Sequence, residues 1–300
     1  MSTIKKQYNT VVSRAKKGVP GFANAYAKFI ERVTINQSSK SLIVNYSRSL
    51  AYVALEFNRS PHEVSVEELN SYLYRMMVHE QCSLTYFKHA VFALRYWFRL
   101  FDMEEKAIQM PPVKKEKKLP VVLSKQECKE LFKAPRSLKH RFLLTLAYGS
   151  GLRMNEVRML RITDLDVQRL QVRVRQGKGR KDRYVPLSVF LSKKLPLYLE
   201  TCKPQTWLFE GNTPGQPMGA RSIQYIVNEA LPKTAITKQV SMHTLRHSCA
   251  THLLEDGIDI HSIQHFLGHA NLLTTMIYLH VAQVKIKPVH SPLDSLYNLL

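Results

Sequence analysis

A proline-containing, lysine-rich stretch near residue 110 most constrains how this chain can fold. The segment MEEKAIQMPPVKKEKKLP carries paired prolines, few apolar residues and a cluster of four lysines, a composition typical of a connector between domains. At 300 residues the chain also exceeds the usual length of a single domain. We therefore expect an N-terminal domain over residues 1–104, a basic linker over residues 105–120 and a second domain over residues 121–300.

The N-terminal half predicts a small helical bundle. Apolar residues recur at three- and four-residue spacing, which is the pattern of helices packed on one face. The sequence NRSP interrupts this pattern, and Ser65 with Glu68 three residues later forms a capping box. The expected helices cover residues 22–33, 40–57, 66–79 and 83–101.

Aromatic residues crowd the last of these helices. Rings of this kind form either a hydrophobic core or a platform on which bases stack. Because they follow helical spacing on a run with few charges, we interpret them as core residues. The cluster consists of Phe87, Phe92, Tyr96, Trp97 and Phe98.

The C-terminal half mixes helices with a β-hairpin. LQVRVR alternates apolar and basic residues, QGKGRKD has the composition of a turn, and RYVPL resumes as a partner strand, which places Lys178 at the hairpin tip. Gly257 and Gly268 stand at helix C-termini. Overall the chain is expected to be mainly α with a small β-sheet. The expected helices include a segment ending at residue 148, a short one from residue 155, and residues 220–231, 244–256, 260–267 and 272–283.

The composition points to a polyanionic partner. Lys and Arg number 44 against 23 Asp and Glu, for a formal charge of +21 and a pI near 9.9. No apolar run of about 18 residues and no signal-peptide pattern is present, so nucleic acid is favoured over a membrane. The four cysteines lack paired spacing, which argues against a disulfide framework and a cysteine zinc site. We expect a cytoplasmic, nucleoid-associated protein.

Two basic segments are candidates for contact with DNA phosphates. Between Arg158 and Arg183 nine basic residues face three acidic ones, which indicates either a phosphate-facing or a merely solvated strand surface. The linker lysines allow the same two interpretations. They are Lys114, Lys115, Lys117 and Lys118.

Four separated blocks carry side chains suited to phosphoryl transfer. A tyrosine oxygen attacks a phosphodiester only if its proton leaves and fixed cations match the charge developing on the phosphorus oxygens. The blocks are GLRMNE with Arg153 and Glu156, GKGRKDRYVPL with Lys178, HTLRH with His243 and Arg246, and LGHANLLTTMIY with His269 and Tyr278.

Each residue type has a distinct use in such a site. The phenol of Tyr278, whose ordinary pKa is about 10, needs cations and a proton acceptor to act as a nucleophile. Arg153 and Arg246 can hold the nonbridging oxygens in place of a metal ion. Lys178 can protonate the leaving 5′ oxygen, and the two histidines can donate hydrogen bonds or move protons. Taken singly, a tyrosine on a helix is more often a core residue.

In these blocks and their order the chain resembles the tyrosine recombinases, the phage-integrase-type site-specific recombinases. The resemblance implies a two-domain DNA clamp, with a helical, SAM-like core-DNA-binding domain before an α+β catalytic domain. It also implies a 3′-phosphotyrosyl intermediate, a site braced by Glu156, and no metal or other cofactor. The implied partners are double-stranded recombination sites of mobile-element or chromosomal type. The implied assembly is a homotetramer on synapsed DNA, with a monomer or weak oligomer when DNA is absent.

The C-terminal end carries a second, narrower resemblance. SPLDSL over residues 291–296 is similar to the ending of integron integrases. Only residues 182–242 separate the lysine hairpin from HTLRH, without the long insertion of those enzymes, which argues against recombination of folded single-stranded sites. Val281 and Val284 extend the expected tyrosine helix towards Pro288. The tail beyond it either packs on its own domain or, as the resemblance implies, docks on a neighbouring protomer.

Other functions fit the sequence less well. His261, His265 and His269 recur at four-residue steps, but Gly268 is expected to end the helix before the third, and the glutamate of HExxH is absent. GKGRK does not match a phosphate-binding loop. A type IB topoisomerase, which uses the same chemistry, and a non-catalytic DNA-binding protein remain the alternatives.

Overall fold

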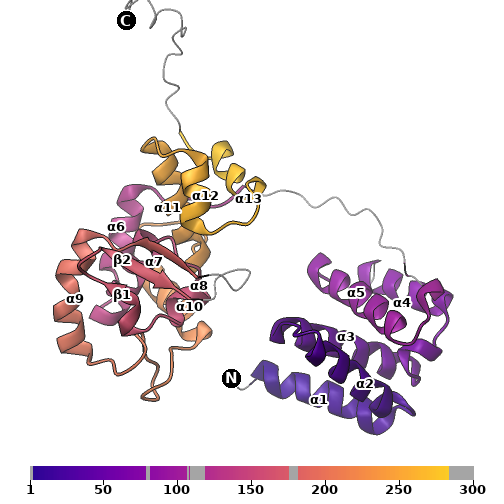
Figure 1. Ribbon diagram of the computed structural model, residues 1–300. Helices are drawn as coiled ribbons and strands as arrows, with labels where there is room; N and C mark the ends of the chain where they lie inside the picture. Colours follow the sequence, from indigo (N-terminus) through magenta and orange to yellow (C-terminus); the bar gives the residue numbers. More distant parts are fainter. Residues whose placement is uncertain (1–2, 79–81, 107, 109–118, 176–181, 284–300) are drawn as a thin grey trace, which may run out of the picture. The chain divides into compact units, whose positions relative to one another are not determined.

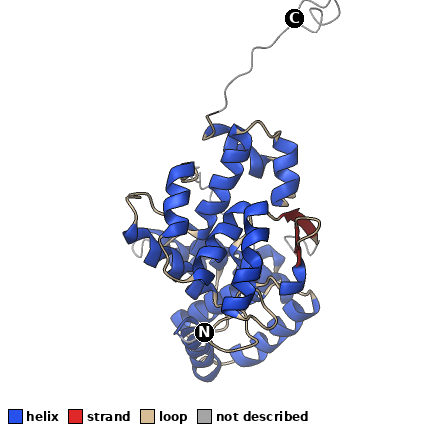
Figure 2. Ribbon diagram, turned by 90° about the vertical axis from the view of Figure 1, so that its left-hand side faces the viewer, coloured by secondary structure: helices blue, strands red, loops and turns tan. Residues whose placement is uncertain are grey.

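The computed structural model describes residues 3–78, 82–106, 108, 119–175 and 182–283. The chain divides into two compact units, Met1–Glu116 and Lys117–Leu300. Figure 1 shows both units, and Figure 2 shows that their described parts are mostly helical, with a small sheet. The expected fold class is therefore confirmed. The linker bounds at residues 105 and 120 stay a prediction, and the linker lysines lie outside the described residues.

The N-terminal unit is a bundle of α-helices. All four predicted helices are confirmed, with ends within two residues of those expected. The first helix of the unit was not predicted because its basic sequence contains few apolar positions, among which Val11, Val12 and Ala15 are buried. The helices are α1 (Thr3–Gly18), α2 (Phe22–Ile35), α3 (Lys40–Phe57), α4 (Val66–Val78) and α5 (Leu84–Leu100).

Local side-chain bonds fix where α3 ends and α4 begins. Asn58 adopts a left-handed conformation with φ +48° after the last turn of α3. The Glu68 amide donates to Ser65 Oγ at 3.2 Å, and the Ser65 amide donates to Glu68 Oε2 at 3.0 Å. The predicted capping box is confirmed, and it satisfies two amides that the first turn of α4 leaves without helical partners.

The aromatic cluster of α5 forms the core of this unit. Trp97 is fully buried and stacks on Phe22 at a centroid distance of 5.9 Å. Phe87 and Phe98 are also buried, so the interpretation of these rings as core residues is confirmed for them. Phe92 is 38% exposed and does not belong to that core.

The C-terminal unit surrounds a short antiparallel sheet with helices. The predicted hairpin is confirmed, with Val172 opposite Val185 and both side chains buried. A further strand of two residues, too short to show a pattern, extends the sheet in the order β1-β2-β3. The strands are β1 (Leu165–Asp166), β2 (Gln171–Val174) and β3 (Arg183–Pro186).

Five helices of this unit match the prediction closely, and two others were not predicted. Those two are α6 (Lys125–Lys133) and α9 (Val189–Cys202). The others are α7 (Leu138–Gly149), α8 (Met154–Arg158), α10 (Ala220–Ala230), α11 (Met242–Glu255) and α12 (Ile260–Leu267).

Helix α11 lies at the centre of the C-terminal unit. It packs against α7, α10 and α12, which leaves most of its side chains buried. Met242 and Leu245 belong to the large core around the sheet, whereas Ala250 and Leu254 belong to a smaller cluster with α12. Side chains in the first two turns of α11 therefore lie where the two cores meet.

The predicted tyrosine helix over residues 272–283 is wrong in its length. The chain forms a single α-helical turn, α13 (Leu273–Met276), and continues as the 3₁₀ turn η5 (Ile277–His280). Val281, with φ −121°, is no longer in a helical conformation. The tighter turn brings Tyr278 into the small cluster beside α11, and this tertiary packing overrides the helical pattern. Val284 and the tail lie outside the described residues.

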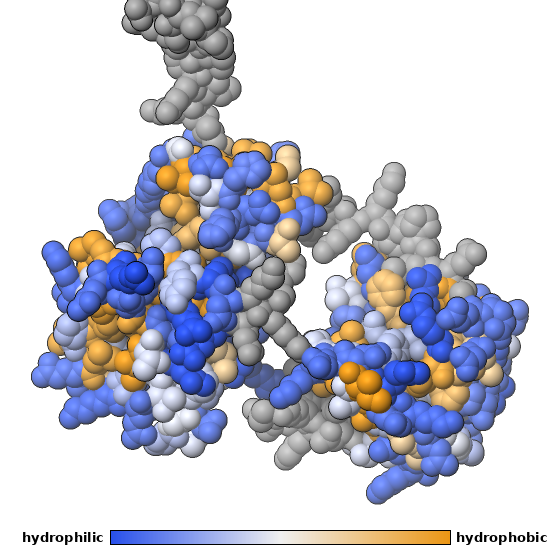
Figure 3. All heavy atoms as spheres, viewed as in Figure 1, coloured by the Kyte–Doolittle hydropathy of each residue, from blue (hydrophilic) through white to orange (hydrophobic). Residues whose placement is uncertain are grey.

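Hydrophilic side chains cover most of the visible face of both units, with apolar residues between them (Figure 3). None of the helices in the described ranges is long and apolar enough to cross a membrane.

Candidate active site

Arg153 precedes helix α8 directly after a tight turn at Gly151. The turn requires glycine, because its φ is +57° and a Cβ atom there would lie 2.6 Å from the Phe266 ring. Glu156 bonds back to the start of the helix, where its Oε2 accepts from the Arg153 amide and its Oε1 from Arg153 Nη1, each at 2.8 Å. The carboxylate therefore fixes the direction of the Arg153 guanidinium.

Glu156 brings three arginines together. It accepts a bidentate pair of hydrogen bonds from Arg183, both at 2.9 Å, and Arg246 Nη1 lies 3.9 Å from its Oε2. Burial acts to raise the pKa of Glu156, but the bonds from Arg183 and Arg153 outweigh it and lower that pKa to about 2. Three guanidinium groups around one carboxylate leave an excess of two positive charges, which favours binding of a phosphate.

Arg246 is held rigidly on α11. Its guanidinium donates from Nη1 to the Gly151 carbonyl at 2.6 Å and from Nη2 to the Leu267 carbonyl at 2.7 Å. Burial, together with the charge of Arg153, lowers the pKa of Arg246 to about 10, so the group stays protonated at neutral pH. The residue is only 3% exposed. Its charge is thus fixed in position before any ligand binds.

His269 follows the end of α12 and joins this network. Gly268 ends the helix in a left-handed conformation, as predicted, and a Cβ atom there would lie 2.9 Å from Arg183 Cδ. His269 Nε2 lies 3.0 Å from Arg246 Nη2, and Nδ1 lies 2.8 Å from Thr275 Oγ1. The imidazole is therefore held between an arginine and a buried hydroxyl.

His243 lies in the first turn of α11, one turn before His247. Its side chain is exposed. Burial of part of the ring and the charges of Arg246 and Arg153 lower its pKa, so the imidazole is neutral at neutral pH. It can accept a proton or donate one hydrogen bond to a ligand at this surface.

Tyr278 is buried beside α11 with 1% of its surface exposed. Its hydroxyl lies 3.1 Å from His247 Nδ1. Burial raises the pKa of Tyr278 to about 12, against the opposing influence of the Arg246 and Arg153 charges. The structure thus places the Tyr278 hydroxyl at His247, the residue that follows Arg246 on α11.

Lys178 lies outside the described residues, in the stretch between β2 and β3. A groove of about 520 Å³ opens beside Glu156, and it is lined by Arg161, Arg173 and Arg175. Arg161 lies over the Trp207 ring at 5.2 Å. Two of these arginines are paired with carboxylates, Arg173 with Asp182 at 2.7 Å and Arg175 with the buried Asp164.

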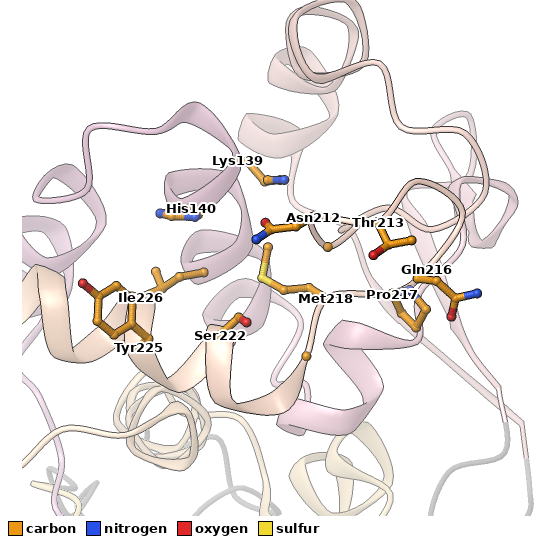
Figure 4. Close-up of a pocket in the computed structure, with 12 residues that line it drawn as sticks. Lys139, His140, Asn212, Thr213, Gln216, Pro217, Met218, Ser222, Tyr225 and Ile226 are labelled. Atoms are coloured by element: carbon orange, nitrogen blue, oxygen red, sulfur yellow. The ribbon is translucent and has the colours of Figure 1, made fainter. Parts of the chain in front are cut away.

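A second cavity, of about 350 Å³, is lined by residues of α7, of α10 and of the segment before α10, among them His140 and Tyr225 (Figure 4). None of the predicted site residues lines it. The three histidines considered as a metal site are divided as expected, with His261 and His265 on α12 and His269 beyond Gly268. Among the residues that the structure describes, no group of three His, Cys, Asp or Glu side chains is placed to hold a metal ion.

Comparisons with known proteins agree with this geometry. Residues 121–284 match the model of the phage integrase family. An integrase/recombinase of Sinorhizobium fredii, y4qK, is 35% identical over 268 residues, which are 89% of this chain and 87% of that protein. Tyrosine recombinase XerC of Bacillus licheniformis is 33% identical and covers 87% of this chain and 92% of its own length.

The chain belongs to the phage integrase family, the tyrosine recombinases. The crystal structure of the XerA recombinase has a similar fold, with a TM-score of 0.50 and 28% identity over 93% of this chain and 98% of that chain. The protein is a site-specific recombinase, an enzyme that breaks and rejoins DNA strands. These relatives favour a recombinase over a type IB topoisomerase or a non-catalytic DNA-binding protein.

Three residues that contact the predicted site residues were not themselves predicted. Arg183 bonds to Glu156, His247 to Tyr278, and Thr275 to His269. A signal existed for His247, which lies four residues after His243 and therefore on the same face of α11. Arg183 contacts a partner 27 residues away, and Thr275 on α13 contacts His269 in the segment after α12, so neither contact follows from a helical or strand pattern.

Proposed function

We propose that this recombinase cuts double-stranded DNA at recombination sites through attack of the Tyr278 hydroxyl on a phosphodiester. The tyrosine oxygen bonds to the phosphorus, giving a 3′-phosphotyrosyl linkage and a free 5′ hydroxyl. The observation that carries this proposal is the convergence of three arginines on Glu156, with the Tyr278 hydroxyl 3.1 Å from His247, the neighbour of Arg246 in the sequence.

In this proposal Arg153 and Arg246 stabilise the phosphorane-like transition state. Their positions are fixed by Glu156 and by backbone carbonyls, so little reorganisation is needed as negative charge grows on the nonbridging oxygens. Glu156 braces both arginines and keeps enough charge unneutralised to hold a phosphate. Fixed cations of this kind supply what a metal ion supplies in other phosphoryl-transfer enzymes.

The remaining residues of the proposed site are His243, His269 and Lys178. His243 is exposed beside the arginines and can donate to a nonbridging oxygen. His269 contacts Arg246 and aligns it. Lys178 protonates the leaving 5′ oxygen, and β3, which follows its segment, is anchored to the site through Arg183 and Glu156.

Rejoining is the same step in reverse. The phosphotyrosyl bond retains the free energy of the original phosphodiester, so a 5′ hydroxyl from another duplex can attack it without ATP.

We propose that four subunits on two duplexes carry out this exchange, and that the chain is a monomer or weak oligomer without DNA. The linker lysines and the arginine groove contact DNA phosphates, and the enzyme acts at the nucleoid, where its substrate lies.

Covalent trapping on nicked DNA tests the proposal. The protein is incubated with nicked duplexes that bear the end sequences of its own element, and covalent complexes and exchanged strands are resolved on denaturing gels. Covalent complexes that persist in excess chelator are expected. Relaxation of plasmids without sequence preference would indicate a topoisomerase, and absence of any covalent complex would indicate a binding protein.

A further inference from the structure

His247 contacts the hydroxyl of Tyr278, the proposed nucleophile. Its Nδ1 lies 3.1 Å from the Tyr278 hydroxyl, and the two rings are 5.7 Å apart with an interplanar angle of 53°. His247 lies on α11 beside Arg246, whereas Tyr278 comes from η5. The contact therefore joins two segments that lie 31 residues apart in the sequence.

The imidazole of His247 is in the state that accepts a proton. Burial, with the neighbouring charges of His243 and Arg246, lowers its pKa, so at neutral pH one ring nitrogen carries a lone pair. Tyr278 in turn is hard to ionise in advance, because burial raises its pKa to about 12. A proton acceptor at the hydroxyl removes the need for prior ionisation.

We propose that His247 is the general base for Tyr278, and that its Nδ1 takes the phenolic proton as the bond from the tyrosine oxygen to phosphorus forms. The bond from phosphorus to the 5′ oxygen breaks in the same step, and that oxygen takes its proton from Lys178. In rejoining, the protonated His247 returns its proton to the departing tyrosine oxygen. This inference rests on the proposed function of Tyr278.

Packing holds the Tyr278 ring independently of His247. The ring belongs to an apolar cluster with Ala250, Leu254 and Leu267, and Ala250 and Leu254 follow His247 on the same face of α11. Removal of the imidazole therefore leaves the ring in place and removes only the group at its hydroxyl. Loss of proton transfer and loss of position can thus be separated.

Single-turnover cleavage of nicked duplex tests the proposal. His247→Ala is expected to slow covalent-complex formation about a hundredfold or more, which is the usual contribution of a general base. His247→Asn keeps a polar atom near the position of Nδ1 but does not take a proton, so it is expected to be equally slow. His261→Asn, at an exposed histidine in the first turn of α12, is the matched control and should retain the wild-type rate.

Two further readouts separate base catalysis from positioning. A substrate with a 5′-bridging sulfur leaves without protonation, so it should relieve a Lys178→Ala defect but not a His247→Ala defect. The cleavage rate of His247→Ala should also keep rising with pH until Tyr278 ionises. The other groups whose charge influences the Tyr278 hydroxyl are Arg246, Arg153 and Cys249. Thermal unfolding and DNA binding confirm that each variant folds.

The outcomes are distinct. Wild-type activity in His247→Asn with a slow His247→Ala would show that the contact only positions the tyrosine, and it would overturn the proposal. A rate within threefold of wild type in His247→Ala would do the same. A wild-type protein that forms no covalent complex would instead overturn the proposed function on which this inference rests.

Discussion

Arg246 Nη2 donates a hydrogen bond to His269 Nε2 over 3.0 Å, and this contact decides where the proton of that imidazole lies. An arginine has no acceptor, so Nε2 must present a lone pair. The ring proton is then on Nδ1, which donates to Thr275 Oγ1 at 2.8 Å. Thr275 accepts this proton and so supports the tautomer that Arg246 selects for His269, a proposed site residue.

Thr275→Val tests this relationship. The change removes the acceptor of the Nδ1 proton while keeping the β-branched shape, and we expect about a tenfold loss of cleavage rate, or about 1.4 kcal/mol. Thr274→Val, the same change at an exposed neighbour, is the control. Equal rates in the two variants would show that the hydroxyl does not orient His269.

Tyr278→Phe should abolish covalent attachment. Only the hydroxyl is lost, and the ring keeps its place in the cluster beside α11, so DNA affinity in a gel-shift assay should stay at the wild-type level. If the variant still forms the adduct, another tyrosine is the nucleophile, and Tyr225 and Tyr297 would be tested next.

Arg153→Ala and Arg246→Ala should each slow cleavage about a hundredfold or more, as expected for the loss of one fixed donor at a developing oxyanion. Conversion to lysine should restore little, because the forked geometry is lost. Single-turnover rates on nicked duplex provide the measurement. A loss below tenfold in either alanine variant contradicts its assigned role.

Glu156→Gln should change how stability depends on acid. The folded-state pKa of about 2 lies below the ordinary value of 4.5, so the carboxylate stabilises the fold above pH 4.5 and loses that effect as the pH falls towards 2. We expect the variant to be less stable than wild type by about 3 kcal/mol at neutral pH. The difference should shrink across that window in denaturant titrations, whereas Glu200→Gln, at an exposed site on α9, should show no such change.

Ending the chain after Pro288 should separate binding from assembly. The family resemblance implies that the leucine-rich tail docks on a neighbouring protomer, so single-site DNA binding should persist while synapsis and strand exchange decline. Gel-shift and recombination assays on paired sites measure the two separately. Full-rate recombination by the shortened chain would show that the tail is dispensable.

Local patterns predicted the parts of this fold that local interactions determine. The capping box at Ser65 and Glu68 and the left-handed turn at Gly268 depend on residues within a few positions of each other. Helix α9 was not predicted, although a local signal existed. Ser188 caps the start of the helix, and its hydroxyl accepts from the Leu191 amide at 3.2 Å. A long helix was predicted over residues 272–283 because the local pattern does not show that this segment packs against α11.

The site divides in the same way. Arg153, Glu156, Arg246 and Tyr278 were predicted from their chemistry and from the resemblance of their blocks to a family. The structure brings both arginines to Glu156 and places Tyr278 at His247, next to Arg246. Arg183 was missed because its partner Glu156 lies 27 residues away. A bidentate bond across that separation depends on the sheet, on α8 and on the close approach at Gly268.

The small cluster that holds Tyr278 affects how easily its segment opens. It contains few buried residues compared with the large core around the sheet, so we expect the segment that carries the tyrosine to open more readily than the helices of that core. Amide hydrogens of α13 and η5 should therefore exchange with solvent far sooner than those of α7. If Tyr278 is the nucleophile, as proposed, its hydroxyl lies on a segment held by a much smaller core than the rest of the unit.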